Sequence, residues 1–258
     1  MKRTNKLFVY VALSIVGFSA CKKSDKGNPD IPGAVYGPTA ALGKGSIRAF
    51  VVMNKEGKPE TIGMNFTASV LDDLPTDSTK EYEFPVELPE EAKVTGFDHL
   101  AVDWNPVGHE PKPIYGLPHF DFHYYRITKE EQATVEPGPD NTPVSEIYIP
   151  RDYISNMIAV PDMGVHWVDS KAPEFAGQKF TDTFIYGFYH GALTFMEPMI
   201  SREFLLSKPD FTINIKQPKA FQKQGYYPTL SHIKYDAGSN QYIMTLEGLE
   251  LREAVVEH

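Results

Sequence analysis

The chain has 258 residues, and its 34 acidic residues outnumber its 25 Lys and Arg residues, for a formal net charge of −9. This acidic balance excludes the class of proteins that bind nucleic acid through a basic surface. Because the chain has one cysteine, an intrachain disulfide framework and a cysteine-rich zinc site are also excluded.

The N-terminus has the pattern of an export signal. The basic residues Lys2, Arg3 and Lys6 precede an apolar run over residues 7–20, which ends in small residues. This order is typical of a secretory signal peptide. The run is shorter than the roughly 20 residues that a membrane-spanning helix needs. Residues 1–20 are therefore predicted to be a signal peptide.

Cys21 lies at the predicted cleavage point. The segment Phe18-Ser19-Ala20-Cys21 resembles the bacterial lipobox, in which the cysteine carries lipid after cleavage. We therefore expect an N-terminal lipid to anchor the protein to the cell envelope, at the outer rather than the inner membrane, facing the periplasm or the exterior. Residues 21–43 are rich in Lys, Asp, Gly and Pro, which predicts a flexible tether. Residues 44–258 remain as one domain.

Beyond the tether the sequence predicts short antiparallel strands, because aromatic residues make up 12% of a chain with 21 prolines and 19 glycines. Residues 46–53 and 60–71 form a predicted hairpin around a polar turn. Two more hairpins are expected, over 183–197 with its turn at His190-Gly191 and over 230–251. Single strands are expected at 84–88, 119–127, 145–149 and 165–168.

Helices are expected to be few and short. Thr128 begins a capping box, and residues 201–206 have room for one or two helical turns. The predicted fold is therefore mainly β, an antiparallel sandwich or barrel with few short helices.

The residues able to carry chemistry lie mostly in one predicted strand. Over residues 119–125, side chains alternate between the two faces of a strand. His119, Asp121 and His123 therefore share one face, while the other face carries aromatic residues that suit a core. A face with two imidazoles and a carboxylate indicates metal binding or proton transfer.

Strand geometry limits how these side chains share an ion. Neighbours on one face lie about 6.6 Å apart, so His119 and His123 are about 13 Å apart in a regular strand. A regular strand therefore offers His119 with Asp121, or Asp121 with His123, and a bend is needed for both histidines. We predict a divalent metal such as zinc, bound by His119, Asp121, His123 and His166. His109, Glu110 and Glu197 are secondary candidates.

Other interpretations of the same residues stay open. Asp121 could instead fix the tautomer of a histidine, and the polar face could bind a small polar ligand without metal or form a structural hydrogen-bond network.

His190 is expected to be a turn residue, and His99, in a loop-like stretch, has no expected functional role. Glu197 is expected to end its strand, because Pro198 follows it.

The order of several motifs resembles a known family. These motifs are Asp103-Trp104-Asn105-Pro106, Gly108-His109-Glu110-Pro111, His119-Phe120-Asp121-Phe122-His123, Met163-Gly164-Val165-His166-Trp167 and Phe195-Met196-Glu197-Pro198. Over about residues 46–251 the chain resembles a family of bacterial exported proteins and lipoproteins with a β-rich domain and no assigned activity. The resemblance implies that His109, His119, Asp121, His123, His166 and Glu197 form one shared set.

The expected function is that of a membrane-tethered extracytoplasmic lipoprotein with a His/Asp/Glu-lined pocket. The sequence has no Gly-x-Ser-x-Gly elbow, phosphate-binding glycine loop or His-Glu-x-x-His motif, so it identifies no reaction. One alternative is a non-catalytic structural or stress-response envelope protein, alone or as a homo-oligomer. Another is a metal-dependent hydratase, hydrolase or isomerase with Asp121 or Glu197 as general base.

Overall fold

The computed structural model describes residues 31–80 and 82–256, so the predicted signal peptide and Cys21 lie outside the described residues. Within this part of the chain, antiparallel strands dominate and helices are short, which confirms the mainly β prediction. The α-helices are α1 (Lys112–Tyr115), α2 (Lys129–Gln132) and α3 (Arg202–Leu206), with short 3-10 turns elsewhere. No helix in the described ranges has the length and apolar character needed to cross a membrane.

One of the two large sheets has six strands. Its order is β1 (Ala34–Leu42), β2 (Gly45–Met53), β3 (Pro59–Thr67), β16 (Gln241–Glu247), β15 (Leu230–Asp236) and β13 (Asp210–Asn214). The predicted hairpin of β2 and β3 is present. Strand β1 corrects the expected start of ordered structure, because it lies inside the predicted tether and pairs with β2 from Ala34 onwards.

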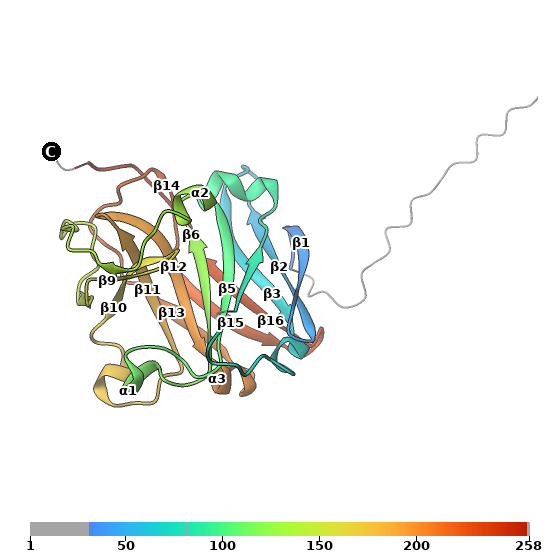
Figure 1. Ribbon diagram of the computed structural model, residues 1–258. Helices are drawn as coiled ribbons and strands as arrows, with labels where there is room; N and C mark the ends of the chain where they lie inside the picture. The colour runs from blue at the N-terminus through green and yellow to red at the C-terminus, as the bar shows by residue number, and fades with distance from the viewer. Residues whose placement is uncertain (1–30, 81, 257–258) are drawn as a thin grey trace, which may run out of the picture.

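The second large sheet has nine strands. Its order is β4 (Glu83–Val86), β5 (His99–Asn105), β6 (His119–Tyr125), β12 (Ala192–Ser201), β11 (Asp182–Tyr189), β10 (Gly164–Asp169), β9 (Ile158–Val160) and β7 (Gly138–Pro139), with β8 (Tyr153–Ile154) beside β10. A small sheet joins β14 (Gly225–Tyr227) to β17 (Glu250–Arg252). Both large sheets are open, and they lie against each other as a sandwich (Figure 1).

The sandwich core is aromatic where β6 crosses it. The side chains of Phe120, Phe122 and Tyr124 enter this core, as the alternation in the sequence predicts. The ring of Phe122 stacks on Phe66 of the facing sheet with centroids 5.7 Å apart. Burying each such ring contributes about 1.5–3 kcal/mol, so this face holds β6 firmly in register.

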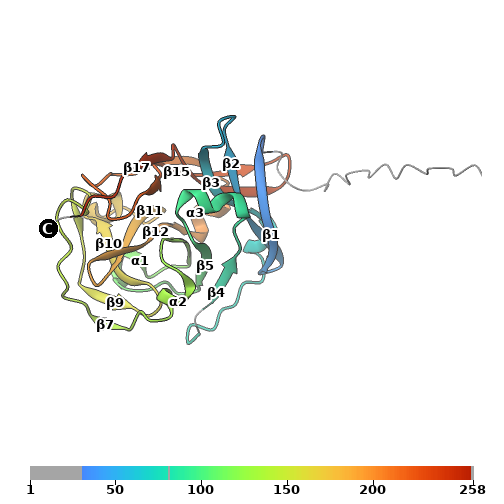
Figure 2. The same ribbon diagram turned by 90° about the horizontal axis from the view of Figure 1, so that it is seen from above.

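The nine-stranded sheet also has a second buried face. Figure 2 shows the strands from β4 to β9 curving around an interior, and Figure 1 places α1 at one end of this sheet. A separate apolar cluster fills this curve and includes Tyr115, Phe180 and Phe195. Both faces of β6 are therefore buried, and its polar face points into the curve rather than toward solvent.

Three local predictions need correction. Residues 145–149 form a turn, in which Tyr148 N–H donates to the Ser145 carbonyl, because prolines on either side interrupt strand pairing. The 3-10 turn Ala68–Leu71 follows β3, where the sequence predicts a strand up to residue 71. His99 begins β5 and does not lie in a loop.

Strand β12 is longer than predicted, because it continues past Pro198 to Ser201. Proline lacks the N–H that a sheet ladder uses. The pairing of β12 with β6 is absent between Met196 and Met199, although the register is the same on both sides, and Pro198 stays paired with Phe184 of β11. The strand therefore accommodates the proline without ending, and Glu197 lies in the middle of the sheet.

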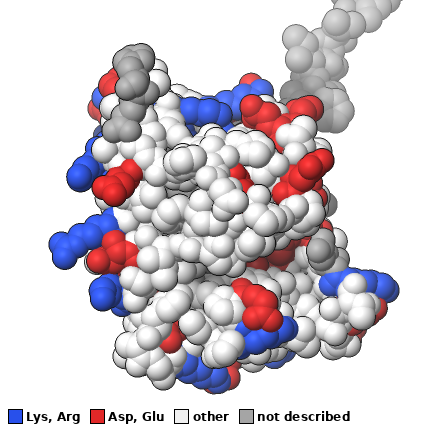
Figure 3. All heavy atoms as spheres, turned by 60° about the vertical axis from the view of Figure 1, so that its left-hand side comes forward, with Lys and Arg blue, Asp and Glu red and all other residues white. Residues whose placement is uncertain are grey.

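Charged side chains of both signs are mixed on the surface. Figure 3 shows one face, with a broad central area of uncharged residues and with acidic and basic residues around it. On this face the basic residues form no continuous patch.

Candidate functional site

The polar face of β6 lies in the curve of the nine-stranded sheet. His119 and His123 are fully buried, and Asp121 is 5% exposed. Register places Asp103 of β5 directly opposite Asp121, and Glu197 reaches the same face from β12. A loop after β5 brings in His109, and β10 brings in His166.

His109, His119 and Asp121 form one group, which we call the Asp121 trio. One ligand atom from each lies within 4.8 Å of the other two. His119 Nε2 is 3.3 Å from Asp121 Oδ1, and His109 Nε2 is 3.7 Å from Asp121 Oδ2. All three side chains therefore converge through the atoms that bind metal ions in proteins.

Hydrogen bonds to neighbouring groups hold each member of the Asp121 trio in place. His119 Nδ1 lies 2.7 Å from the Leu117 carbonyl oxygen, and His109 Nδ1 lies 2.7 Å from that of Glu110. A carbonyl oxygen only accepts, so both Nδ1 atoms carry a proton, and Nε2 is the atom of each ring that is left to bind a metal ion. Asn105 Nδ2 donates to Asp121 Oδ2 at 2.6 Å, which fixes the carboxylate.

His123, His166 and Glu197 form a second group, the Glu197 trio, again with ligand atoms within 4.8 Å of one another. Glu197 Oε2 is 3.5 Å from His123 Nε2 and 3.6 Å from His166 Nε2. His166 Nδ1 donates to the Gly164 carbonyl at 3.2 Å. Asp103 Oδ2 lies 3.0 Å from His123 Nδ1, behind the ring. The two trios thus have the same composition, two imidazoles and one carboxylate.

Several of the converging atoms are buried without a hydrogen-bond partner among the described residues. They include His119 Nε2, Asp121 Oδ1, His123 Nε2 and both carboxylate oxygens of Glu197. A buried polar atom left unpaired costs about 1–3 kcal/mol, and a charged one costs more. Such atoms are rare in folded proteins, and here they are concentrated in one place, where a bound ion could pair them.

The distances within the trios fit a metal ion better than direct hydrogen bonds. Charge-assisted N–H···O contacts have lengths of about 2.7–2.9 Å. Two tetrahedral ligands on bonds of about 2.0–2.1 Å lie about 3.3–3.4 Å apart. The four observed separations run from 3.3 to 3.7 Å. The buried groups could therefore hold a metal ion.

Burial and mutual charge shift the pKa values in both trios. Burial lowers the pKa of His109, but the Asp121 carboxylate outweighs this effect and raises it to about 9. Burial likewise lowers the pKa of His123, and the Glu197 and Asp103 carboxylates raise it to about 9. Burial raises the pKa of Glu197 to about 8. The two histidine shifts share one cause, the buried carboxylates beside the rings, whereas the Glu197 shift comes first from burial.

The remaining pKa shifts in the trios are downward. Burial, together with the neighbouring histidines His123 and His109, lowers the pKa of His166 to about 3. Burial also lowers the pKa of His119. Both rings are therefore neutral at physiological pH, which is the form that binds metal.

Aromatic packing orients the Glu197 trio. The ring of Phe195 meets His123 edge-on at 4.8 Å between centroids and His166 at 5.0 Å. Phe195 fits there because residue 187 on the paired strand β11 is glycine, where a Cβ would come within 2.1 Å of the ring. Phe195 and Gly187 thus act together to position both imidazoles.

The structure divides the residues that the sequence predicts as one set. His119 and Asp121 fall in one trio and His123 and His166 in the other, so the strand needs no bend. Of the secondary candidates, His109 and Glu197 each join a trio. Glu110 stays outside, since its carboxylate accepts from the Lys112 N–H at 2.8 Å.

Asp103 is the site residue that the sequence reasoning missed. Its strand, His99-Leu-Ala-Val-Asp-Trp-Asn105, alternates like β6, with Leu100, Val102 and Trp104 in the sandwich core. Reading that alternation would have placed Asp103 on the same face as Asp121. His99 has its own partners, Asp98 and Gln132.

The histidine in the predicted hairpin turn has the backbone conformation of a turn residue. His190 has φ 49° and precedes Gly191 at φ 81°, as a tight two-residue turn requires.

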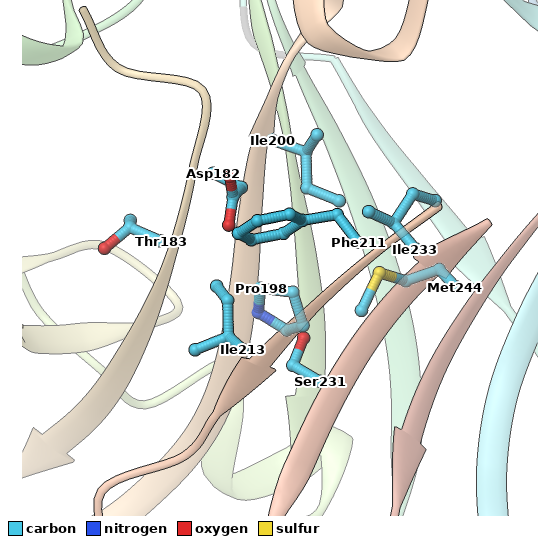
Figure 4. Close-up of a pocket in the computed structure, with 9 residues that line it drawn as sticks. All are labelled: Asp182, Thr183, Pro198, Ile200, Phe211, Ile213, Ser231, Ile233 and Met244. Carbon is cyan, nitrogen blue, oxygen red and sulfur yellow. The ribbon is translucent and has the colours of Figure 1, made fainter. Parts of the chain in front are cut away.

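A pocket lies apart from the two trios, at the seam where β13 approaches β11 and β12. Figure 4 shows it lined mainly by apolar side chains, among them Ile200, Phe211 and Met244. Its volume of about 10 Å³ has room for about one water molecule. Asp182 borders it, and burial raises the pKa of this carboxyl to about 6. The pocket is too small for an organic ligand.

No family model, curated protein or solved structure matches the chain. The family resemblance of its motifs stays a prediction. The case for a function therefore depends on the geometry of the two trios.

Proposed function

We propose that the Glu197 trio binds one divalent first-row transition-metal ion, such as zinc, in a protein held on the cell envelope by lipid on Cys21. One observation carries the metal assignment. Glu197 is fully buried, and neither of its carboxylate oxygens has a hydrogen-bond donor in the described part of the chain. An ion between Glu197 and the two imidazoles would satisfy this carboxylate.

The buried carboxylates around Glu197 support the proposal of a bound cation. Asp103, Asp121 and Glu197 are all buried, and within residues 31–80 and 82–256 their ion-pair contacts are with histidines alone. Burying unpaired charge is costly unless a counter-charge accompanies it. A divalent cation would supply that counter-charge at the point where the ligand atoms converge.

Each member of the Glu197 trio has a definite role in this proposal. His123 and His166 bind through Nε2, and Glu197 binds through Oε2. Asp103 stands behind His123 at Nδ1, which is the carboxylate–histidine–metal arrangement that fixes the ring and raises its basicity. The side chain of His166 is 21% exposed, which provides a route for the ion from solvent.

The ligand number favours one further candidate function, metal-assisted hydration or hydrolysis. Three protein ligands leave a tetrahedral ion one position for water, as in catalytic zinc sites. A bound divalent ion lowers the pKa of such a water to about 7. Thiocyanate added to the cobalt-loaded protein would shift the visible spectrum if that position exchanges ligands. An unchanged spectrum would argue against this candidate.

Zinc titration tests the metal proposal. The processed full chain, purified in detergent without a polyhistidine tag and dialysed against a chelator, is titrated by calorimetry at neutral pH. We expect Glu197→Gln to bind one equivalent fewer than the wild type. Glu247→Gln is the matched control, since Glu247 also contacts a histidine, His232, but outside the trios. The proposal fails if the wild type binds no zinc, or if Glu197→Gln binds as much as the wild type.

The lipid anchor has its own test. A bacterial host expressing the wild-type chain is fed an alkyne-labelled fatty acid, and the purified protein is analysed by mass spectrometry. We expect label on the N-terminal peptide beginning at Cys21, and none on a Cys21→Ser variant. A wild-type chain without fatty acid would overturn the anchor and leave the metal proposal unaffected.

A further inference from the structure

We infer that the Asp121 trio is a second and separate metal site, so that each chain binds two divalent ions. This inference rests on the proposed function for the class of ion, but its ligands, His109, His119 and Asp121, belong to it alone. The two sites can therefore fail independently.

The Asp121 trio has the geometry of a ligand set. His119 Nε2 lies 3.3 Å from Asp121 Oδ1, close to the tetrahedral edge of about 3.3–3.4 Å, and His109 Nε2 lies 3.7 Å from Oδ2. One ligand atom from each of the three residues lies within 4.8 Å of the other two. The rings of His109 and His119 stand at 86° to each other, with centroids 4.6 Å apart. Two perpendicular rings that both direct Nε2 at one carboxylate leave a point between the three atoms where an ion can bind.

Burial makes the Asp121 trio more than a surface cluster. His119 is fully buried and Asp121 is 5% exposed, and His119 Nε2 and Asp121 Oδ1 have no hydrogen-bond partner among the residues that the structure describes. A protonated histidine paired directly with Asp121 would close to about 2.7–2.9 Å. The longer separations, with every Nδ1 held by a backbone carbonyl, favour a bound cation.

An ion in the Glu197 trio does not satisfy these atoms. The ligand atoms of the two trios do not converge as one group within 4.8 Å. Along β6, His119 and His123 are two same-face steps apart, about 13 Å in a regular strand. The first ion would therefore leave His119 Nε2 and Asp121 Oδ1 unpaired. A second ion is needed to pair them.

The loop that carries His109 is shaped for its position. Gly108 has φ 65°, and a Cβ there would lie 1.9 Å from the Tyr115 carbonyl oxygen. The loop packs this closely because His109 N–H donates to the same carbonyl at 3.3 Å. The His109 side chain is 37% exposed, which gives the second site its own route to solvent.

The number of bound ions tests the inference. The processed full chain is stripped with a chelator and loaded with cadmium-113, then measured by elemental analysis and by NMR. We expect two ions per chain and two cadmium resonances. Asp121→Asn, which keeps the size of the side chain, should lose one ion and one resonance, and Glu197→Gln should lose the other. Glu110→Gln, next to His109 but outside the trio, should keep both.

Each alternative result has a definite meaning. One ion that survives Asp121→Asn but not Glu197→Gln overturns the second site and leaves the proposed function standing. One ion lost in both variants overturns the inference in favour of a single shared site. Two ions retained by Asp121→Asn place the second ion elsewhere and also overturn it. A wild-type count of zero removes both sites. The wild-type count needs no variant to fold.

Discussion

Asp103 and Asp121 lie directly opposite each other on the neighbouring strands β5 and β6, and both are buried. Like charges in this arrangement destabilise a sheet. Each carboxylate faces a histidine instead, Asp103 the ring of His123 and Asp121 the ring of His119. The pairing of β5 with β6 thus places the carboxylate behind His123 next to the carboxylate of the Asp121 trio.

Replacing Asp103 tests its role behind His123. Asp103→Asn keeps the shape but removes the charge at Nδ1, and such outer partners contribute roughly 10–100-fold to metal affinity. We expect zinc at the Glu197 trio to bind about that much more weakly, while the number of bound ions stays at the wild-type value. Competition titration with a chromophoric chelator measures the change. An affinity equal to that of the wild type would show that Asp103 does not position the ring.

Glu197→Gln should separate the stability of the metal-free protein from that of the loaded one. Without metal, the variant should be at least as stable as the wild type, because an uncharged amide costs less to bury than a carboxylate that accepts no hydrogen bond. Zinc at 100 times its dissociation constant adds about 2.7 kcal/mol per site. That energy raises the melting temperature by roughly 5–10 °C in a chain of this size.

Thermal unfolding with zinc and with chelator measures both quantities. Glu197→Gln should lose the part of the zinc-induced rise in melting temperature that comes from zinc bound at the Glu197 trio. An equal rise in Glu197→Gln and in the wild type would contradict the ligand role of Glu197.

Much of the fold follows from local sequence. The alternation in β6 predicts both of its faces, and the predicted hairpins appear with their turns. Pro198 misled the strand prediction because the strand tolerates it only where pairing with β6 is absent, which is a property of the assembled sheet. Strand β1 was missed because its alanines, Gly37 and Pro38 have low strand propensity, so that the segment gains order from pairing with β2.

The site was predictable by residue type but not by grouping. Alternation places His119, Asp121 and His123 on one face, yet the partner of each is set by neighbours distant in the chain. His166 and Glu197 reach His123 through β10 and β12, whereas His109 reaches Asp121 through a loop. Only the strand order of the nine-stranded sheet decides between one site and two.

Gly187→Ala tests the packing that orients the Glu197 trio. Its new Cβ would lie 2.1 Å from the ring of Phe195, so the ring must move away from His123 and His166. Overpacking of this kind costs about 1–3 kcal/mol. We expect lower stability in urea denaturation and also weaker zinc binding by calorimetry.

Gly238→Ala is the control for this substitution. Its Cβ meets only ordinary contacts at 3.6 Å or more, so its stability should stay within about 0.5 kcal/mol of the wild type. Normal zinc affinity in a destabilised Gly187→Ala protein would show that Phe195 does not orient the two rings.

A histidine outside the trios should give folding stability a separate pH dependence. The Glu247 carboxylate, 3.2 Å from Nδ1, and Asp210, 2.8 Å from Nε2, raise the pKa of His232 above its usual value of 6.5. His232 in turn lowers the pKa of Glu247 below its usual 4.5. A raised histidine pKa stabilises the fold below pH 6.5 and loses this contribution as the pH rises through the raised value. A lowered glutamate pKa stabilises it above pH 4.5 and loses this contribution as the pH falls.

The stability difference between wild type and His232→Gln should therefore be largest between about pH 4.5 and 6.5. It should shrink as the pH rises through the raised pKa of His232, because the ring then loses its proton and with it the attraction to both carboxylates. Urea denaturation of both proteins in chelator, at pH 5.5 and at pH 8.5, measures the difference without a contribution from bound metal. Glu110→Gln, which leaves His232 and its partners intact, should show the pH dependence of the wild type. A difference that is the same at both pH values would mean that the charge on His232 contributes nothing to folding, because loss of an uncharged contact does not depend on pH in this range.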